Sequence, residues 1–241
     1  MLPMFAGHYA VSFAATSLNK RIPVWRLFLA TQFLDVLWCV FIFAGIEKAR
    51  VVPGITASFP LDLYYNPYTH SLVTALAWSL LVVVIYRLTI SRSERHSFYT
   101  AGIVGAVVFS HWVCDLIVHR PDLPLYGNAH KLGLGLWNYR AAALVLETSA
   151  LLLGLWIYMC DSEAASTRDK LKMPLIVLGV LLIHAALIFG PPPASARAAA
   201  AMLLVVYFGL SAGALWAECR TGGSARQTDS SEHMGKSGVA S

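Results

Sequence analysis

The chain has 241 residues, of which 57% are hydrophobic and 13% are charged, and the charged share is about half that of a typical soluble domain. With a mean hydropathy of +0.62, so much apolar surface is accommodated only if part of it faces lipid. This composition excludes a soluble enzyme, a disordered chain and a nucleic-acid-binding protein. The net charge of +5 adds little, because membrane proteins gather Lys and Arg in their cytoplasmic loops.

Apolar segments divide the chain into predicted membrane helices. The first, residues 4–18, is short and either crosses the bilayer or only enters it. Six further segments each approach the ~20 residues that a spanning helix needs: residues 23–46, 70–90, 98–118, 139–160, 172–190 and 197–217. The prediction is therefore an all-α fold, a polytopic transmembrane helical bundle of six to seven helices within residues 1–218.

Composition and proline mark the ends of these segments. Pro23, Pro174 and the run Pro191–Pro193 stand at segment ends, where proline is tolerated or stops a helix. Residues 219–241 contain no aromatic residue and turn to Gly, Ser and scattered charge, which predicts a disordered C-terminal tail.

Loop charges set the orientation, because cytoplasmic loops carry an excess of Lys and Arg. If all seven segments cross, the loops alternate between two sides. One side carries Lys20, Arg21, Arg92, Arg95, Arg168 and Lys170, followed by the tail. The other carries Lys48, Arg50, Arg120 and Lys131. The richer first side is assigned to the cytoplasm, so that the long loops 47–69 and 119–138 face outward.

Ionisable side chains lie inside the predicted helices, where each costs roughly 2.5–3.5 kcal/mol on insertion and therefore needs a partner or a function. His111 and Asp115 are four residues apart in SHWVCDLIVH, so a helix places both on one face. His119 continues the stripe, either as a ligand or as a loop residue. The spacing suits two ligands of one metal; the alternative is a His–Asp hydrogen bond that joins helices.

The depth of these groups favours one common site. At a rise of 1.5 Å per residue, Asp115 lies about 6 Å and His111 about 12 Å below the outer end of their helix. Adjacent helices run in opposite directions, so the polar groups of five segments converge on the outer half of the membrane: His8, Asp35, His70, His111, Asp115 and Glu147. Imidazole nitrogens and carboxylate oxygens without a thiolate suit Zn²⁺ or another divalent transition ion.

Two groups of residues complete the candidate site. In the long loops, Arg50, Arg120 and Lys131 either bind an anionic group such as a phosphate or form a solvated rim. Glu147 is a ligand, a general base or a carboxylate paired with a nearby Arg. His184, alone in LLIHAAL, is predicted to be a hydrogen-bonded helix-packing residue.

At these residues the chain resembles bacterial inner-membrane proteins described as membrane-bound metal-dependent hydrolases, the LexA-binding inner-membrane hydrolase family. The matching pieces are Gly7–His8, the segment around Asp35, Thr69–Ser71 and the HxxxD of His111–Asp115, within roughly residues 5–120. That family is in turn similar to zinc-dependent phospholipase C and the P1-type nucleases. In those enzymes an Asp, a His and an HxxxD pair hold one zinc, and an early His shares the last Asp with a second.

The resemblance implies a ligand set for this chain. The first site would contain Asp35, His70, His111 and Asp115, and His8 would contribute to a second site that shares Asp115. The soluble enzymes also have a third site with an HxxxE pair. Here Ala143 stands four residues before Glu147, so that third site is absent or rebuilt from His119 or His130.

These observations predict a membrane-embedded metal-dependent hydrolase of a bacterial inner membrane, with its site on the outer side. One or two Zn²⁺ ions would activate water, with Glu147 and His119 as candidate catalytic residues. A phospholipid or other phosphoester amphiphile is the expected substrate. Two other classes stay open: a transporter or channel with an intramembrane metal or proton site, and a non-catalytic membrane scaffold.

Overall fold

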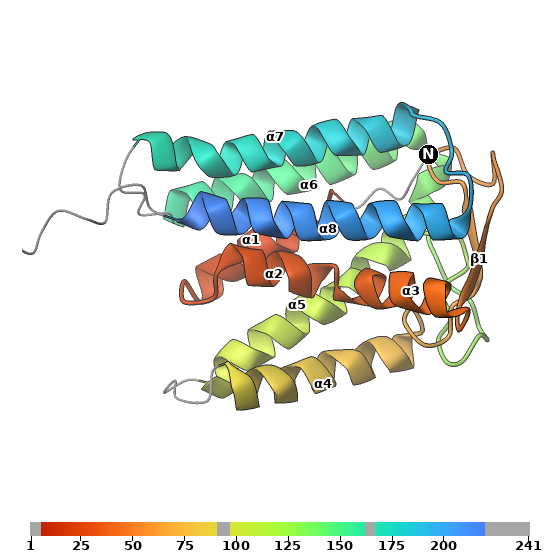
Figure 1. Cartoon of the computed structure of the whole chain (residues 1–241), viewed down its shortest axis with the longest axis horizontal. Helices are drawn as coiled ribbons and strands as arrows, with labels where there is room; N and C mark the ends of the chain where they lie inside the picture. The colour runs from red at the N-terminus through yellow and green to blue at the C-terminus, as the bar shows by residue number, and fades with distance from the viewer. Residues whose placement is uncertain (1–5, 91–96, 162–166, 220–241) are drawn as a thin grey trace, which may run out of the picture.

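The computed structural model of the chain describes residues 6–90, 97–161 and 167–219, and these residues are mostly helical (Figure 1). The predicted tail, residues 219–241, lies almost wholly outside the described residues. The elements in chain order are α1 (His8–Leu18), α2 (Val24–Thr31), α3 (Phe33–Ala44), β1 (Lys48–Val51), β2 (Leu61–Tyr65), α4 (Leu72–Thr89), α5 (Ser97–Val118), the 3₁₀ turn η1 (Leu136–Asn138), α6 (Arg140–Asp161), α7 (Thr167–Phe189) and α8 (Ala196–Glu218).

Five of the described helices, α4 to α8, are long and apolar enough to cross a bilayer. The helices α2 and α3 reach the necessary length only together, and they are bent by 50° relative to each other. Helix α1 has 11 residues and a length of about 16 Å, about half of the ~30 Å hydrocarbon core. The described chain therefore contains five candidate spans, or six if the bent pair counts as one. The predicted bundle of six to seven spans is not confirmed.

The loop between α3 and α4 contains secondary structure that the all-α prediction did not include. Strands β1 and β2 form an antiparallel pair in which Arg50 faces Asp62 and Val51 faces Leu61, with an irregularity between Lys48 and Arg50. Pairing satisfies the backbone groups of this segment where it lies against buried side chains. The residues of β2 that cover the helices, Leu61 to Leu63, are buried, whereas Tyr64 is exposed.

The break between α2 and α3 falls at Gln32, within the segment predicted as one helix over residues 23–46. Helix α2 begins after Pro23, and α3 ends at Gly45 in the left-handed conformation, with φ of 72°, a usual helix stop. The break leaves the carbonyl of Thr31 available to a side chain, and His111 Nδ1 donates to it. It also places Asp35 in the first turn of α3, where the helix dipole stabilises a carboxylate.

One proline does not lie where the sequence predicted. Helix α7 begins at Thr167, so Pro174 lies inside the helix rather than at its end. Proline has no N–H to donate, and the helix tolerates it here at the cost of one backbone hydrogen bond near its N-terminus. The prolines of the run 191–193 do lie between α7 and α8.

The arrangement of the helices separates two ends of the molecule. In Figure 1 the connections of residues 45–71, 119–139 and 190–195 lie at one end, with β1, and the turn of residues 19–23 lies at the other. Helix α1 packs against α6, α2 and α5, while α3 packs against α8 and α4 against α5. The buried apolar side chains form two clusters, one centred on α1, α6, α7 and α8 and one on α2, α4 and α5.

Close helix packing at Gly154 provides a test of the fold. A Cβ on Gly154 would lie 2.8 Å from Ala10 Cα and 2.9 Å from the Ala10 carbonyl oxygen, so α1 and α6 would have to separate. We expect Gly154→Ala to lower the free energy of unfolding by about 1–3 kcal/mol, measured by thermal unfolding in detergent. Gly179→Ala is the control, because no atom from another described element lies within 4 Å of its Cβ position. Equal stabilities of the two variants would contradict this packing.

Candidate metal centre

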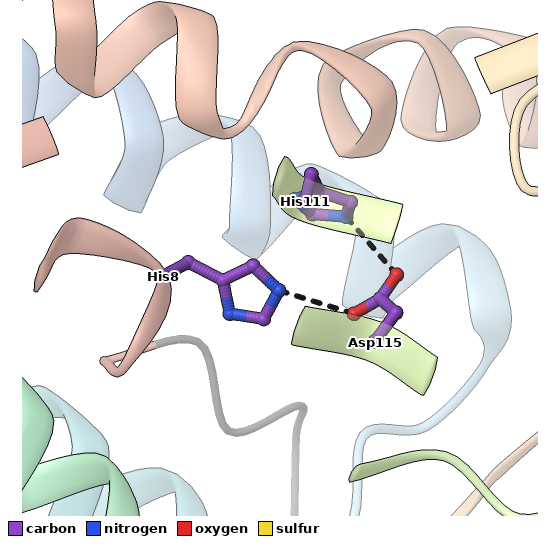
Figure 2. Close-up of side chains that lie close together, drawn as sticks. All are labelled: His8, His111 and Asp115. Atoms are coloured by element: carbon purple, nitrogen blue, oxygen red, sulfur yellow. Dashed lines mark hydrogen bonds and ion pairs between the residues drawn. The ribbon is translucent and has the colours of Figure 1, made fainter. Parts of the chain in front are cut away.

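Asp115 lies at the centre of a group of four histidines. Its Oδ1 is 3.1 Å from His8 Nε2 and 3.7 Å from His119 Nε2. Its Oδ2 is 3.2 Å from His111 Nε2 and 3.5 Å from His70 Nε2. All five residues are at most 3% exposed, and Figure 2 shows His8 and His111 approaching opposite oxygens of the carboxylate. Each oxygen of Asp115 thus faces its own pair of imidazoles.

Asp35 adds a second carboxylate on the other side of this group. Its Oδ1 is 3.2 Å from His70 Nε2 and 3.5 Å from His111 Nε2. Its Oδ2 accepts a hydrogen bond of 2.5 Å from the hydroxyl of Tyr207, on α8. Two sets of ligand atoms lie within 4.8 Å of one another in the described residues, one from His8, His111 and Asp115 and one from Asp35, His70 and His111.

Local helix geometry explains how α5 contributes to the cluster. His111 and Asp115 are one turn apart on α5, and His119 follows one turn later, immediately after the helix ends at Val118. Residues four apart share a helix face, and these three are all buried. The other members come from α1, from α3 and from the residue two before α4, so long-range packing has to bring them together.

Hydrogen bonds to the distal nitrogens determine which ring nitrogens are free. His111 Nδ1 donates to the carbonyl oxygen of Thr31 at 2.8 Å, the last residue of α2 before the helix break. His119 Nδ1 donates to Asp122 Oδ1 at 2.9 Å. A carbonyl oxygen accepts but cannot donate, so the lone pair of neutral His111 lies on Nε2, the atom that faces the carboxylates. Such support of the distal N–H is the usual arrangement around metal-binding histidines.

The residues present fit a divalent metal. His111 Nε2 and Asp115 Oδ2 are buried, and neither makes a hydrogen bond to any described residue, although they lie 3.2 Å apart. Buried polar atoms are normally paired, and a cation between these two atoms would satisfy both. The donors are nitrogen and oxygen, and no described cysteine belongs to the two ligand sets, which suits Zn²⁺ or a similar ion.

Two histidines outside the candidate spans have shifted pKa values in opposite directions. Burial lowers the pKa of His8, against the opposing influence of Asp115. Burial also acts to lower the pKa of His119, but the carboxylates of Asp122 and Asp115 outweigh it and raise this pKa above its ordinary value. The pKa values of His8 and His119 thus depart from the ordinary value in opposite directions, although both rings face the same oxygen of Asp115.

A small cavity lies against the cluster, with a volume of about 20 Å³, which is room for about one water molecule. The candidate ligands that line it are His8, Asp35, His70, Asp115 and His119. The rest of its wall is apolar and consists of Trp38, Phe59, Leu61, Leu63, Trp137 and Leu203. The rings of Phe59 and Trp137 also pack on His119, with centroids 6.0 and 4.3 Å from its ring.

The three basic residues predicted to bind substrate are engaged in the loops. Arg50 Nε donates to Asp62 Oδ2 at 2.8 Å, and Arg120 donates to the other oxygen of Asp62 while its Nε lies 3.3 Å from Asp122. Lys131 Nζ donates to the carbonyl oxygens of residues 63 and 64. Burial lowers the pKa of Lys131. Arg120 and Lys131 therefore join the loop after α5 to the hairpin, Arg50 joins the two strands of the hairpin, and none of the three lines the cavity.

Glu147 lies beside the cluster rather than in it. Its Oε2 accepts the backbone N–H of Gly7 at 3.3 Å, next to His8, and it is 3% exposed. Its Oε1 accepts no hydrogen bond of normal geometry from the described residues.

The prediction that His184 is hydrogen-bonded is wrong: it is fully buried, and neither ring nitrogen has a hydrogen-bond partner among the residues that the structure describes.

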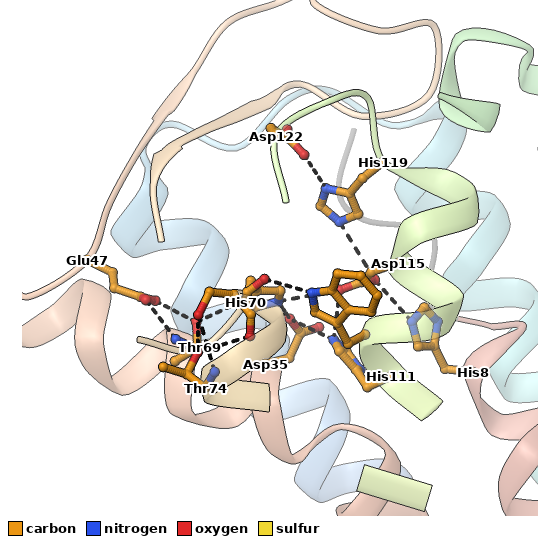
Figure 3. A network of polar contacts seen from close by, with 12 residues as sticks. His8, Asp35, Glu47, Thr69, His70, Thr74, His111, Asp115, His119 and Asp122 are labelled. Atoms are coloured by element: carbon orange, nitrogen blue, oxygen red, sulfur yellow. Dashed lines mark hydrogen bonds and ion pairs between the residues drawn. The ribbon is translucent and has the colours of Figure 1, made fainter. Parts of the chain in front are cut away.

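Several supporting residues were missed from the sequence. Asp122 follows His119 by three residues, so the sequence spacing could have indicated the contact between them. Tyr207 and Glu47 gave no local signal, because they meet the cluster only through the packing of α8 and through the loop after α3. Figure 3 shows how Asp122 and Glu47 are connected to the histidines.

Comparisons of the chain with protein-family models, with curated proteins and with solved structures found no match. The case for a function therefore depends on the geometry of these side chains.

Proposed function

We propose that this protein is a metal-dependent hydrolase of a bacterial inner membrane. The observation that carries the proposal is the inward-facing Nε2 of His111, buried between Asp115 and Asp35 while Nδ1 is held by a backbone carbonyl. A structural His–Asp contact would need only one imidazole for each carboxylate. Here four imidazoles surround Asp115, an arrangement that favours a bound cation over simple helix pairing.

One or two Zn²⁺ ions suit the donor set. Asp35, His70, His111 and Asp115 would hold the first, and His8 and His119 with the other oxygen of Asp115 would hold a second. A metal there supplies a Lewis acid and activates water at neutral pH. Glu147, or one of the carboxylates among the ligands, would accept the proton.

The surroundings of the cavity support an amphiphilic phosphoester as the substrate. The apolar wall that Phe59, Leu61 and Leu63 provide would face a hydrocarbon or glycerol portion. Arg50 and Arg120 do not line the cavity but meet at Asp62 in the neighbouring hairpin; released from that contact, they would be well shaped for the phosphate. A headgroup is larger than the single water that the cavity accommodates, so the β1–β2 segment would have to move aside when substrate binds.

The orientation is part of the proposal. The connections at the site end of the bundle would face outward, and the end that carries Lys20 and Arg21 would face the cytoplasm. The bent pair α2 and α3 would form a sixth span, and α1 would enter the membrane from the site toward the cytoplasmic end.

Metal content and turnover test the proposal on the purified full chain. We expect wild type to contain one or two equivalents of zinc by elemental analysis, and His111→Ala to contain none. Turnover of a chromogenic phosphodiester or a labelled phospholipid should stop on chelation and return with zinc. Equal metal content in wild type and His111→Ala would overturn the proposal. Zinc flux into liposomes without any hydrolysis would identify a transporter instead.

A further inference from the structure

A buried carboxylate outside the ligand set holds the loop that carries His70. Glu47 follows α3, is 1% exposed, and uses Oε1 to accept two backbone N–H groups, from Tyr68 at 2.8 Å and from Thr69 at 2.9 Å. Its other oxygen, Oε2, accepts the hydroxyl of Thr69 at 2.6 Å. The ionised carboxylate has no proton to give, so in each contact it is the acceptor.

This contact determines the direction of the next hydrogen bond. The Thr69 hydroxyl has a single proton, and it is donated to Glu47. Thr69 Oγ1 lies 2.7 Å from His70 Nδ1, and with its own proton used it can only accept there. His70 Nδ1 must therefore carry the hydrogen of this bond, and the lone pair of the neutral ring lies on Nε2. Figure 3 shows the three side chains in sequence toward Asp35.

The free nitrogen is the one that faces the cluster. His70 Nε2 lies 3.2 Å from Asp35 Oδ1 and 3.5 Å from Asp115 Oδ2. We propose that Glu47 is a positioning residue that acts through the hydroxyl of Thr69 to keep the Nε2 lone pair of His70 directed into the ligand set. The consequence for metal affinity rests on the proposed function; the tautomer of His70 does not.

The substitution Glu47→Gln tests this direction of the hydrogen bonds with little change in the shape of the side chain. The amide oxygen can still accept the two backbone N–H groups, while the NH₂ group replaces the acceptor opposite Thr69. The Thr69 oxygen then accepts from the amide, and its proton is free to point at His70 Nδ1. His70 would switch to the tautomer with hydrogen on Nε2, which would donate to Asp35 or Asp115 and exclude a metal.

The direct measurement is the ¹⁵N spectrum of His70 in the metal-free full chain at alkaline pH, with the signal assigned by its loss in His70→Gln. We expect hydrogen on Nδ1 in wild type and on Nε2 in Glu47→Gln. In competition with a chelator, zinc affinity should fall by about 10- to 100-fold in Glu47→Gln, the usual effect of losing a supporting partner.

Two further variants make the result independent of a folding defect. Thr69→Val keeps the carboxylate and both backbone contacts but removes the hydroxyl, so it should lose as much affinity as Glu47→Gln, and Thr69→Ser should restore it. The double variant Glu47→Gln/Thr69→Val should bind zinc no more weakly than either single variant, because both substitutions interrupt the same chain of hydrogen bonds. The control is Glu218→Gln, since Glu218 also accepts two backbone N–H groups, from Val24 and Trp25, without contacting the cluster.

The outcomes separate this inference from the proposed function. An unchanged His70 tautomer in Glu47→Gln, full zinc affinity in Thr69→Val, or an equal loss in Glu218→Gln would each overturn the role of Glu47. If wild type binds no zinc but the tautomer switches as expected, the proposed function fails and the positioning role stands.

Discussion

Asp115→Asn protein is expected to purify without metal and to hydrolyse a phosphodiester at least about 100-fold more slowly than wild type. Loss of a supporting partner lowers metal affinity by about 10- to 100-fold, and Asp115 contacts all four histidines directly. The substitution keeps the volume of the side chain but removes the charge that both candidate metal positions share. Elemental analysis and steady-state kinetics on the same preparation measure both effects.

The matched control for this variant is Asp161→Asn. The side chain of Asp161 is 42% exposed and lies 3.7 Å from Lys20 Nζ, at the other end of the bundle, so its loss should leave metal content and turnover unchanged. Wild-type metal content in Asp115→Asn would mean that the ion, if any, is bound elsewhere.

Chelation of the metal-loaded wild type is expected to lower its stability as well as its activity. A ligand that binds only the folded state stabilises it by about 2.7 kcal/mol at 100 times its dissociation constant and by about 4.1 kcal/mol at 1,000 times. For a chain of this length, the smaller figure corresponds to a fall in Tm on the order of 5–10 °C. The physical cause is that Asp35 and Asp115 lie on the same buried group of histidines. Once the cation leaves, nothing offsets the repulsion between the two carboxylates or the cost of their desolvation.

Thermal unfolding with and without chelator, followed by the return of zinc or magnesium, measures this effect. Zinc should restore the Tm, and magnesium should not, because imidazole nitrogens suit zinc better than they suit magnesium. Asp115→Asn protein should give the same Tm in both conditions. A wild-type Tm that responds to neither chelator nor zinc would argue for a scaffold whose His–Asp contacts are structural.

The α5 part of the cluster was predictable because it depends on local geometry. His111, Asp115 and His119 recur every four residues, and a helix places such residues on one face whatever surrounds it. The sequence did not determine how Arg50 and Arg120 are used. Both meet Asp62, and that contact arises from a hairpin in a loop for which no strand was predicted.

The helix break at Gln32 could not be predicted from the sequence either, because it too depends on contacts between distant segments. An apolar run gives no sign that it ends at Thr31 and restarts at Phe33, yet this break leaves the carbonyl that holds His111. The two halves pack against α1 and α8, and contacts between distant segments cannot be read from local periodicity.

The amino-acid sequence by itself determined that the chain is apolar enough for membrane helices and where most of them lie, and it predicted that imidazoles and carboxylates occur at comparable depth. Those properties follow from composition and from the fixed rise and turn of a helix. Only the tertiary structure decided that each oxygen of Asp115 faces two histidines, and that Tyr207 and Glu47 support the site. These depend on how each helix is rotated and packed against its neighbours, which is a property of the whole chain.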